Sequence, residues 1–522
     1  MKQLHAMSKI STAILIAASG IALAGCSHKG LELQIQPGPS GTFIALGSEV
    51  EGSITSGSTT FDFNRSAGRG LSIGVAVSGP YPQSKDEAKL FKPASITKLV
   101  TTALALKKLG SGFKYSTNIY YKAGTSSSAA KDLTIIANGD PQVVTRLSGD
   151  GVAQHALLSE IAARLKEQGI SRLEGSLILL SADSRRDAAI PAAGMDESDH
   201  TKCFGAVSQS FNYMWNCAAL NTRNGNASWV DQNLAFPIVG GSGDGERSPA
   251  RPLFSDIGRV VSFAINGHSN EPLQLPISDV KPWYGRALLS VISASGIDTS
   301  SVKIETPSAS ESAQVRANLT SDNSFAIESD SLSELVKFTN KPSDNYFADT
   351  LFKTVAEKNG PGSDLRAEGQ AAFQTAIAGW MRTAGHPDYA NEVHLIDGAG
   401  LSHDNRVSAR AYMTLLREFT KEPTFASLWN SLPIAGVDGT LKSKMNNTSA
   451  VGRVRAKTGT LNGSYQLAGY VPKYAADGTT VEAYIPFVIL SAVDAGKRFN
   501  VFKLQSELAV SLLKLVNPEM RF

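Results

Sequence analysis

Residues 124–332 differ in their pattern of apolar residues from the sequence on either side of them. They contain short apolar runs, such as 133–136, 177–180 and 260–265, broken by Gly, Ser, Asn and Asp, and this pattern is typical of strands. The flanking sequence mixes strand-like alternation with apolar residues at helical spacing. With 522 residues, the chain has the length of about three domains. We therefore expect an α+β protein whose middle part is built mainly of strands.

The first 25 residues predict an exported protein. They carry two lysines and no acidic residue, and their apolar stretch at 12–24 is too short to cross a bilayer comfortably. These features describe a secretory signal peptide that is removed. The letters Leu-Ala-Gly-Cys, which end at Cys26, resemble the bacterial lipobox, in which the cysteine is lipidated and becomes the first mature residue. An ordinary signal peptide followed by a chance cysteine is the alternative.

A lipid on Cys26 would hold the protein to a bacterial membrane. Ser27 is not an aspartate, which resembles lipoproteins sorted to the outer membrane. We therefore expect a periplasmic protein anchored in the outer rather than the inner membrane. Residues 26–64 are rich in Gly, Ser and turn residues, which predicts a tether. No later apolar run reaches 18 residues, so we expect the body of the protein to be soluble.

Charge and cysteine content limit the partners further. The formal net charge is +3, from 50 basic and 47 acidic residues, and 42% of the residues are hydrophobic. This composition excludes a disordered chain and lacks the positive field of nucleic-acid-binding proteins, so we expect no nucleic-acid partner. Besides Cys26, only Cys203 and Cys217 are present. In an oxidising compartment we expect them to form a disulfide, with two free thiols as the alternative.

A serine and a lysine open a helix that is expected at residues 94–109, directly after Pro93. Ser95 and Lys98 share one helical face, so the lysine amine lies beside the serine hydroxyl. A lysine whose pKa is lowered by burial can take the serine proton and create a nucleophile, and the free N–H of Ser95 can bind an oxyanion. The same spacing also begins at Ser111, Ser128, Ser278, Ser300 and Ser511. A solvent-facing lysine therefore remains the alternative for this motif alone.

The triplet Lys457, Thr458 and Gly459 ends an apparent strand, just before a hairpin turn at 462–464. The cation and the hydroxyl suit a carboxylate, and the glycine lets a peptide lie alongside as an added strand. An ordinary sheet edge with a protective lysine is the alternative.

Ser-Asp-Asn occurs twice, at 321–323 and at 343–345. The first copy lies in a polar, turn-like stretch. The second follows Lys341 and Pro342 and leads into apolar residues at helical spacing. A tight joint before a helix can fix side chains in place, so we favour Ser343 and Asn345 as site residues and interpret the first copy as a loop.

In this order, the motifs at 95–98, 343–345 and 457–459 resemble the three signatures of penicillin-binding proteins and serine β-lactamases. The long gap between the first two is similar to the class C, low-molecular-mass D-alanyl-D-alanine carboxypeptidase/endopeptidase family of the penicillin-binding protein 4 type. In that family extra domains are inserted at this point, whereas β-lactamases have a short gap. Other stretches that agree with the family are 93–101, 139–141, 397–402 and 432–440.

The resemblance implies a β-lactamase/transpeptidase-like domain with an antiparallel sheet flanked by helices, formed by residues 65–123 and 333–522. Residues 124–332 would be an inserted, mostly β region of two subdomains. It also implies that Ser95 is the nucleophile, Lys98 its base and Ser343 the relay that passes the proton to the leaving amine. The implied substrate-binding residues are Asn345, Lys457, Thr458, Gly459 and Thr460, the last through an oxyanion-hole N–H.

The implied function is serine-type hydrolysis of peptidoglycan peptides that end in D-alanine or are cross-linked through it, by way of an acyl-enzyme. β-Lactam antibiotics would be covalent inhibitors, and no metal or other cofactor is expected. A serine β-lactamase and a non-catalytic, cell-wall-binding lipoprotein are the rival interpretations. Asp140 and Asp397 lie beside glycines in turns, so we expect them to cap backbone groups rather than to catalyse.

Overall fold

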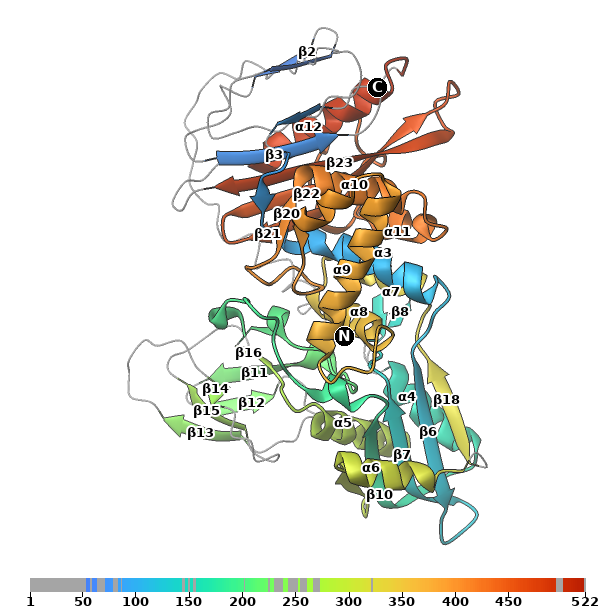
Figure 1. The fold of residues 1–522 in the computed structure, drawn as a ribbon. Coiled ribbons are helices and arrows are strands. Elements are labelled where there is room, and N and C mark those ends of the chain that lie inside the picture. Colours follow the sequence, from blue (N-terminus) through green and yellow to red (C-terminus); the bar gives the residue numbers. More distant parts are fainter. Residues whose placement is uncertain are drawn as a thin grey trace. The chain divides into compact units, whose positions relative to one another are not determined.

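The computed structural model is drawn in Figure 1. The chain in it falls into two compact units, which are described separately. The described residues are 87–142, 156–200, 202–218, 276–320, 323–493 and 501–520, together with the backbone of the strands within 53–85, 146–153 and 219–275. One unit comprises residues 1–36 and 52–63 and contains the hairpin of β1 (Ser53–Ser56) and β2 (Thr59–Asp62). The other unit comprises the rest of the chain. The signal peptide, Cys26 and most of the expected tether lie outside the described residues.

The larger unit contains a five-stranded antiparallel sheet in the order β21-β22-β23-β3-β4. Its strands are β21 (Arg455–Leu461), β22 (Ser464–Tyr474), β23 (Val481–Val493), β3 (Leu71–Val77) and β4 (Gln83–Lys85). Asn462 and Gly463 join β21 to β22 with φ values of 31° and 79°. A two-residue turn with both φ values positive matches the twist of a hairpin, so the hairpin expected from the sequence forms and leaves β21 at the edge of the sheet.

Helices pack around this sheet, and all of them except α12 contribute to one hydrophobic core with it. They are α3 (Thr97–Leu109), α7 (Leu332–Asn340), α8 (Asn345–Glu357), α9 (Leu365–Thr383), α10 (Ala409–Phe419), α11 (Phe425–Ser431) and α12 (Val501–Val516). α10 packs on β3 and β23, and α12 packs on β22 and β23 (Figure 1). Leu99 of α3, Phe347 of α8 and Val488 of β23 are all fully buried in the core. α3 and α8 are enclosed on all sides, because every residue from Thr97 to Leu106 and from Tyr346 to Ala356 is buried.

The inserted region has a second sheet and a second buried cluster. The sheet runs in the order β17 (Lys303–Glu305), β10 (Arg172–Ser181), β7 (Ala129–Ala137), β6 (Ser116–Ala123) and β18 (Ser324–Glu328). Its helices are α4 (Ala156–Glu167), α5 (Lys281–Ala294) and α6 (Ala309–Ala317). Leu133 and Leu177 from the strands pack with Leu158 of α4 and Leu288 of α5 in the second cluster.

Two features of this region differ from the sequence analysis. The region is mixed rather than mostly β, because parallel pairing of β10 with β7 and β17 needs crossover connections, which helices supply. β6, which we assigned to the domain of residues 65–123, pairs with β7 and β18 and so belongs to the inserted sheet. The insertion therefore begins close to residue 116 rather than at residue 124.

Shorter sheets complete the described chain. They are β12 (Asn226–Trp229), β11 (Cys217–Arg223) and β16 (Leu273–Pro276); β13 (Ile238–Ser242), β15 (Val261–Ile265) and β14 (Pro252–Leu253); β8 (Arg146–Ser148) and β9 (Gly151–Ala153); and β19 (Val393–His394), β20 (Arg406–Ser408) and β5 (Leu90–Phe91). The last of these sheets joins the segment before α3 to the segment before α10.

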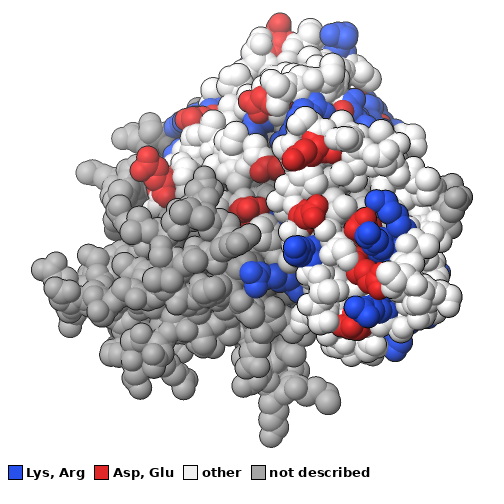
Figure 2. Space-filling model, turned by 90° about the horizontal axis from the view of Figure 1, so that it is seen from below, with Lys and Arg blue, Asp and Glu red and all other residues white. Residues whose placement is uncertain are grey.

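The surface carries mixed charge. On the face in Figure 2, basic and acidic side chains are interspersed over the part of the chain that is described, as the near balance of 50 basic and 47 acidic residues predicts. Among the described residues, no helix combines the length and the apolar character that a bilayer crossing requires.

Candidate active site

Ser95 lies in a tight turn that leads into α3. The turn is the 3-10 helix η1 (Ala94–Ile96), so the helix expected at 94–109 begins as a single 3-10 turn and continues as α3. Ala94 has a φ of 49°, which is unfavourable for a residue with a Cβ atom. A neighbouring turn holds it there, since Gly400 lies so close that a Cβ atom would overlap the Ala94 carbonyl. Ser95 is partly exposed although both its neighbours are buried, so its hydroxyl is accessible on a rigid support.

Lys98 is fully buried, and its amine has three hydrogen-bond partners. Nζ lies 3.0 Å from Ser95 Oγ, 2.7 Å from Asn345 Oδ1 and 2.6 Å from the carbonyl oxygen of Ala399. The last two atoms only accept, whereas a serine hydroxyl can also donate. A neutral amine fits this set, because its two N–H groups serve Asn345 and Ala399 and its lone pair accepts from Ser95.

The charges around Lys98 act in opposite directions on its pKa. Burial lowers the pKa of Lys98 to about 7, while the carboxylates of Asp397 and Asp344 work to raise it. An amine with a pKa near neutrality is unprotonated in a large fraction of molecules at pH 7, which a general base requires.

The start of α8 fixes Asn345. Asp344 is the N-cap residue, and its Oδ1 accepts the N–H of Phe347 at 2.9 Å. Ser343, just before it, has a φ of 66°, so the chain turns sharply into the helix. This is the copy of Ser-Asp-Asn that we favoured from the sequence. Of the other copy, Ser321 and Asp322 lie outside the described residues.

The inserted region contributes two hydrogen bonds to this joint. Asn345 Nδ2 donates to the carbonyl of Phe204 at 2.9 Å, which leaves Oδ1 of Asn345 for Lys98. Trp215 Nε1 donates to Asp344 Oδ2 at 3.0 Å. Phe204 and Trp215 lie near the two ends of a loop that the Cys203–Cys217 disulfide closes, with the two Cα atoms 5.4 Å apart. Burial raises the pKa of Asp344, and the backbone N–H of Phe347, Lys98 and Trp215 oppose this effect.

Lys457 is the second fully buried amine. Its Nζ donates to Ser343 Oγ at 2.7 Å and to the carbonyl of Thr458 at 2.8 Å. The side chain of the next residue makes a separate contact, since Thr458 Oγ1 lies 2.9 Å from Thr440 Oγ1. Burial lowers the pKa of Lys457 well below its ordinary value, and the cations of Lys98 and Lys444 add to this effect. An anion bound here would offset the repulsion and stabilise the charged amine.

The free edge of β21 lies beside the serine. The N–H of Ala456 donates to the carbonyl of Pro433 at 3.1 Å, so the segment 433–435 covers the first half of this edge. Backbone groups alternate along a strand, and the N–H groups of Thr458 and Thr460 therefore face the same side as that of Ala456. A Cβ atom at Gly459 would lie 2.7 Å from the Pro93 carbonyl and 3.2 Å from the Ser95 nitrogen. Gly459 thus allows the strand to pass directly alongside the turn of η1.

The structure brings the three motifs together as one hydrogen-bonded set. Lys98 joins the first motif to the second through Asn345, and Lys457 joins the third to the second through Ser343. Sequence reasoning missed the Ala399 carbonyl, the Thr440 hydroxyl and the two residues of the disulfide loop. The stretches 397–402 and 432–440 had indicated the first two segments without giving them a role.

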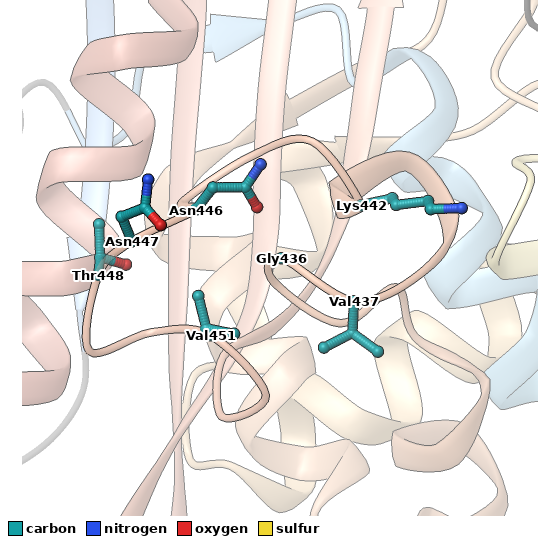
Figure 3. Close-up of a pocket in the computed structure, with 7 residues that line it drawn as sticks. All are labelled: Gly436, Val437, Lys442, Asn446, Asn447, Thr448 and Val451. Carbon is teal, nitrogen blue, oxygen red and sulfur yellow. The ribbon is translucent and has the colours of Figure 1, made fainter.

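A separate cavity of about 660 Å³ lies between Gly436 and Val451. Figure 3 shows its lining, which comes from one segment: Gly436, Val437, Lys442, Asn446, Asn447, Thr448 and Val451. None of these residues belongs to the three motifs. Within the described residues, no group of three or more His, Cys, Asp or Glu side chains is arranged to hold a metal ion.

Comparison with known proteins shows the family to which the chain belongs. Residues 70–495 match the model of the D-Ala-D-Ala carboxypeptidase 3 (S13) family. The chain belongs to this family. It is 26% identical over 414 residues to the D-alanyl-D-alanine carboxypeptidase DacB of Haemophilus influenzae. The aligned stretch covers 76% of this chain and 80% of the relative. Membership of the S13 family confirms the resemblance inferred from the three motifs.

Solved structures show the same fold for this S13 chain. The crystal structure of penicillin-binding protein 4 from Haemophilus influenzae superimposes with a TM-score of 0.66 and 22% identity, over 85% of this chain and 97% of that one. A second crystal structure of that protein, complexed with a β-lactam, gives a TM-score of 0.62 and 23% identity over 84% and 97% of the two chains. The expected fold class, an α+β transpeptidase-like domain with an insertion, is confirmed.

Proposed function

We propose that the protein is a serine-type D-Ala-D-Ala carboxypeptidase that acts on peptidoglycan peptides through an acyl-enzyme. One observation carries this proposal: the buried amine of Lys98 lies 3.0 Å from Ser95 Oγ, and its other two partners are pure acceptors. This arrangement leaves the amine lone pair for the serine proton. Family membership and the named relatives support the same reaction.

Acylation begins when Ser95 Oγ attacks the carbonyl carbon of the penultimate D-alanine while its proton moves to Lys98 Nζ. The negative charge that develops on the carbonyl oxygen is held by the N–H of Ser95 and by that of Thr460 on the open edge of β21. The C–N bond then breaks, the Ser343 hydroxyl gives its proton to the leaving amine, and the proton that Lys98 took from Ser95 passes to Ser343, which leaves Lys98 neutral again. Water, deprotonated by Lys98, hydrolyses the ester and regenerates Ser95.

The Lys457 side of the site holds the end of the substrate. The substrate peptide lies along the open part of β21, with its amide also held by Asn345. Its terminal carboxylate is held by the desolvated amine of Lys457 and by the hydroxyls of Thr458 and Thr440, which lie 2.9 Å from each other. Endopeptidase cleavage uses the same groups when the leaving amino acid has a free carboxylate and the cross-link runs through its side chain.

The proposed setting is the periplasm, with the chain tethered to the outer membrane through a lipid on Cys26. The support is the lipobox-like sequence before Cys26 and the Gly/Ser-rich stretch after it. A Cys26→Ala variant is expected to fractionate with soluble periplasmic proteins, whereas the wild type is expected to remain with membranes. Equal partition of the two would contradict the anchor.

A labelled β-lactam tests the acyl-enzyme directly. The wild type is expected to form an adduct that lasts for minutes or longer, and peptide mapping is expected to place it on Ser95. Ser95→Ala is expected to lose the label and to reduce D-alanine release by more than about 1,000-fold. Ser300→Ala is the matched control, because Ser300 precedes Lys303 at the same spacing but is exposed. Rapid turnover of the adduct would favour a β-lactamase, and full D-alanine release by Ser95→Ala would favour a non-catalytic role for this serine.

A further inference from the structure

The turn at residues 397–402 is attached to the helix of the nucleophile at three places. The Ala399 carbonyl accepts from Lys98 Nζ at 2.6 Å, and the Gly398 carbonyl accepts from Thr101 Oγ1 at 2.6 Å. Gly400 has a φ of 83° and packs directly against the Ala94 carbonyl. A displacement of this turn would therefore move one hydrogen-bond partner of the lysine amine and the residue next to Ser95.

The carboxylate of Asp397 organises this turn. It accepts from the backbone N–H of Leu401 at 2.9 Å and of Ala399 at 3.3 Å, and from Asn405 Nδ2 at 2.6 Å. Asp397 is 2% exposed, and Asn405 is fully buried. All these partners are N–H donors, which suits a carboxylate, since both of its oxygens accept. An asparagine in this place would turn the NH₂ group of its amide toward some of these donors.

Two carboxylates act on the amine of Lys98 from the elements packed against it. Asp397 acts from the turn and Asp344 from the joint before α8, and both favour the charged amine. The other buried amine of the site is Lys457 on β21, and there the effect runs from Lys98, whose charge lowers the pKa of Lys457. Asp397 raises the pKa of Lys98 more than Asp344 does, so it does most to offset the lowering of this pKa by burial.

We propose that Asp397 is a positioning residue for acyl transfer: its carboxylate holds the Ala399 carbonyl against Lys98 and supplies the negative charge that keeps this amine a strong enough base to take the Ser95 proton. The proposal rests on the proposed function of Lys98 and adds a group that does not touch the substrate. A role in capping backbone groups, which we expected from the sequence, is part of it, and the effect on the base goes beyond that role.

The dependence of acylation on pH distinguishes the two roles. The second-order rate constant for acylation by a chromogenic cephalosporin reports the free enzyme. It is expected to rise with pH through the pKa of Lys98, which is about 7, because only the neutral amine accepts the serine proton. Without the nearby anion the amine loses its proton more readily. In Asp397→Asn the midpoint of this rise is therefore expected to move to lower pH by about one pH unit, and the plateau is expected to fall about ten-fold, since the base is weaker.

Two further variants separate charge from structure. Asn405→Ala removes a donor from Asp397 but keeps the carboxylate, so the negative charge is less compensated and the midpoint is expected to move to higher pH. Thr101→Val loosens the same turn without changing any charge, so the rate is expected to fall with the midpoint unchanged. If Asp397→Asn fails to melt cooperatively, the direction of the Asn405→Ala shift decides.

A purely structural role predicts lower rates with the midpoint in place in all three variants, and that result would overturn the proposal. If the wild type itself is not acylated, the function proposed for the site is wrong, and this outcome is distinct from an acylated enzyme whose pH midpoints do not move.

Discussion

Lys98 and Lys457 are both fully buried amines that hydrogen-bond to a serine hydroxyl, but their surroundings differ. Lys98 lies among acceptors, and the carboxylates of Asp397 and Asp344 favour its charged form. Lys457 donates to the Ser343 hydroxyl and to one backbone carbonyl, and the charges that act on it are the cations of Lys98 and Lys444. The negative neighbours of Lys98 are built into the protein, whereas in the proposed function Lys457 gains an anion when substrate binds. The proposal therefore gives burial of a lysine two uses, one to make a base and one to hold a carboxylate.

The largest effect on the acylation rate is expected when Lys98, the proposed base, is replaced. Lys98→Met keeps most of the side-chain volume and removes the amine that lies 3.0 Å from Ser95 Oγ. Acylation by a labelled β-lactam is expected to slow about 1,000-fold or more, within the range of general base catalysis. If the rate fell no more than in Lys457→Met, the assignment of the base to Lys98 rather than Lys457 would be wrong.

A smaller effect is expected for Lys457→Met, about 100-fold in kcat/KM for a peptide that ends in D-Ala-D-Ala. The distinguishing measurement is the same peptide with its terminal carboxylate converted to an amide. The wild type is expected to discriminate strongly between the two peptides, whereas Lys457→Met is expected to treat them almost alike, because the anion's partner is gone. Equal discrimination by both proteins would show that Lys457 does not bind the carboxylate.

The smallest effect concerns the inserted region, which contacts the Lys98 side of the site. Trp215→Phe removes the indole donor to Asp344 and keeps an aromatic ring. Acylation is expected to slow about three-fold, with discrimination between the acid and amide peptides unchanged. Cys203→Ser with Cys217→Ser is expected to give a similar pattern, since the disulfide holds the same loop. A change in peptide discrimination would show that the loop acts on both sides of the site.

Much of the catalytic domain was predictable from the sequence, because local signals and packing agree there. Apolar residues at helical spacing after 343–345 predicted the helix that is α8, and the turn at 462–464 predicted the hairpin. The Ser-x-x-Lys pair was ambiguous by itself, since helical spacing places the two side chains together but says nothing of their burial. The order of the three motifs removed that ambiguity.

The rest depends on contacts that leave no local pattern. The Ala399 carbonyl is a backbone group, and any residue type could supply it. Thr440, Phe204 and Trp215 reach the site from loops that are far apart in the sequence. The helices of the inserted region were missed because short apolar runs in buried strands and buried helices look alike. α4 is an example, since its apolar residues are buried together with those of the strands of the second sheet.

The segment 433–435 has a further consequence for the molecule as a whole. An unpaired strand edge is a template on which another polypeptide can add, and long exposed edges promote aggregation. Here Pro433 and its neighbours pair with β21 as far as Ala456, so the uncovered stretch begins at Thr458 and ends at the turn after Leu461. So short a stretch offers few backbone hydrogen bonds to an unrelated chain. A ligand that binds there therefore also needs a charge and a shape that complement the site.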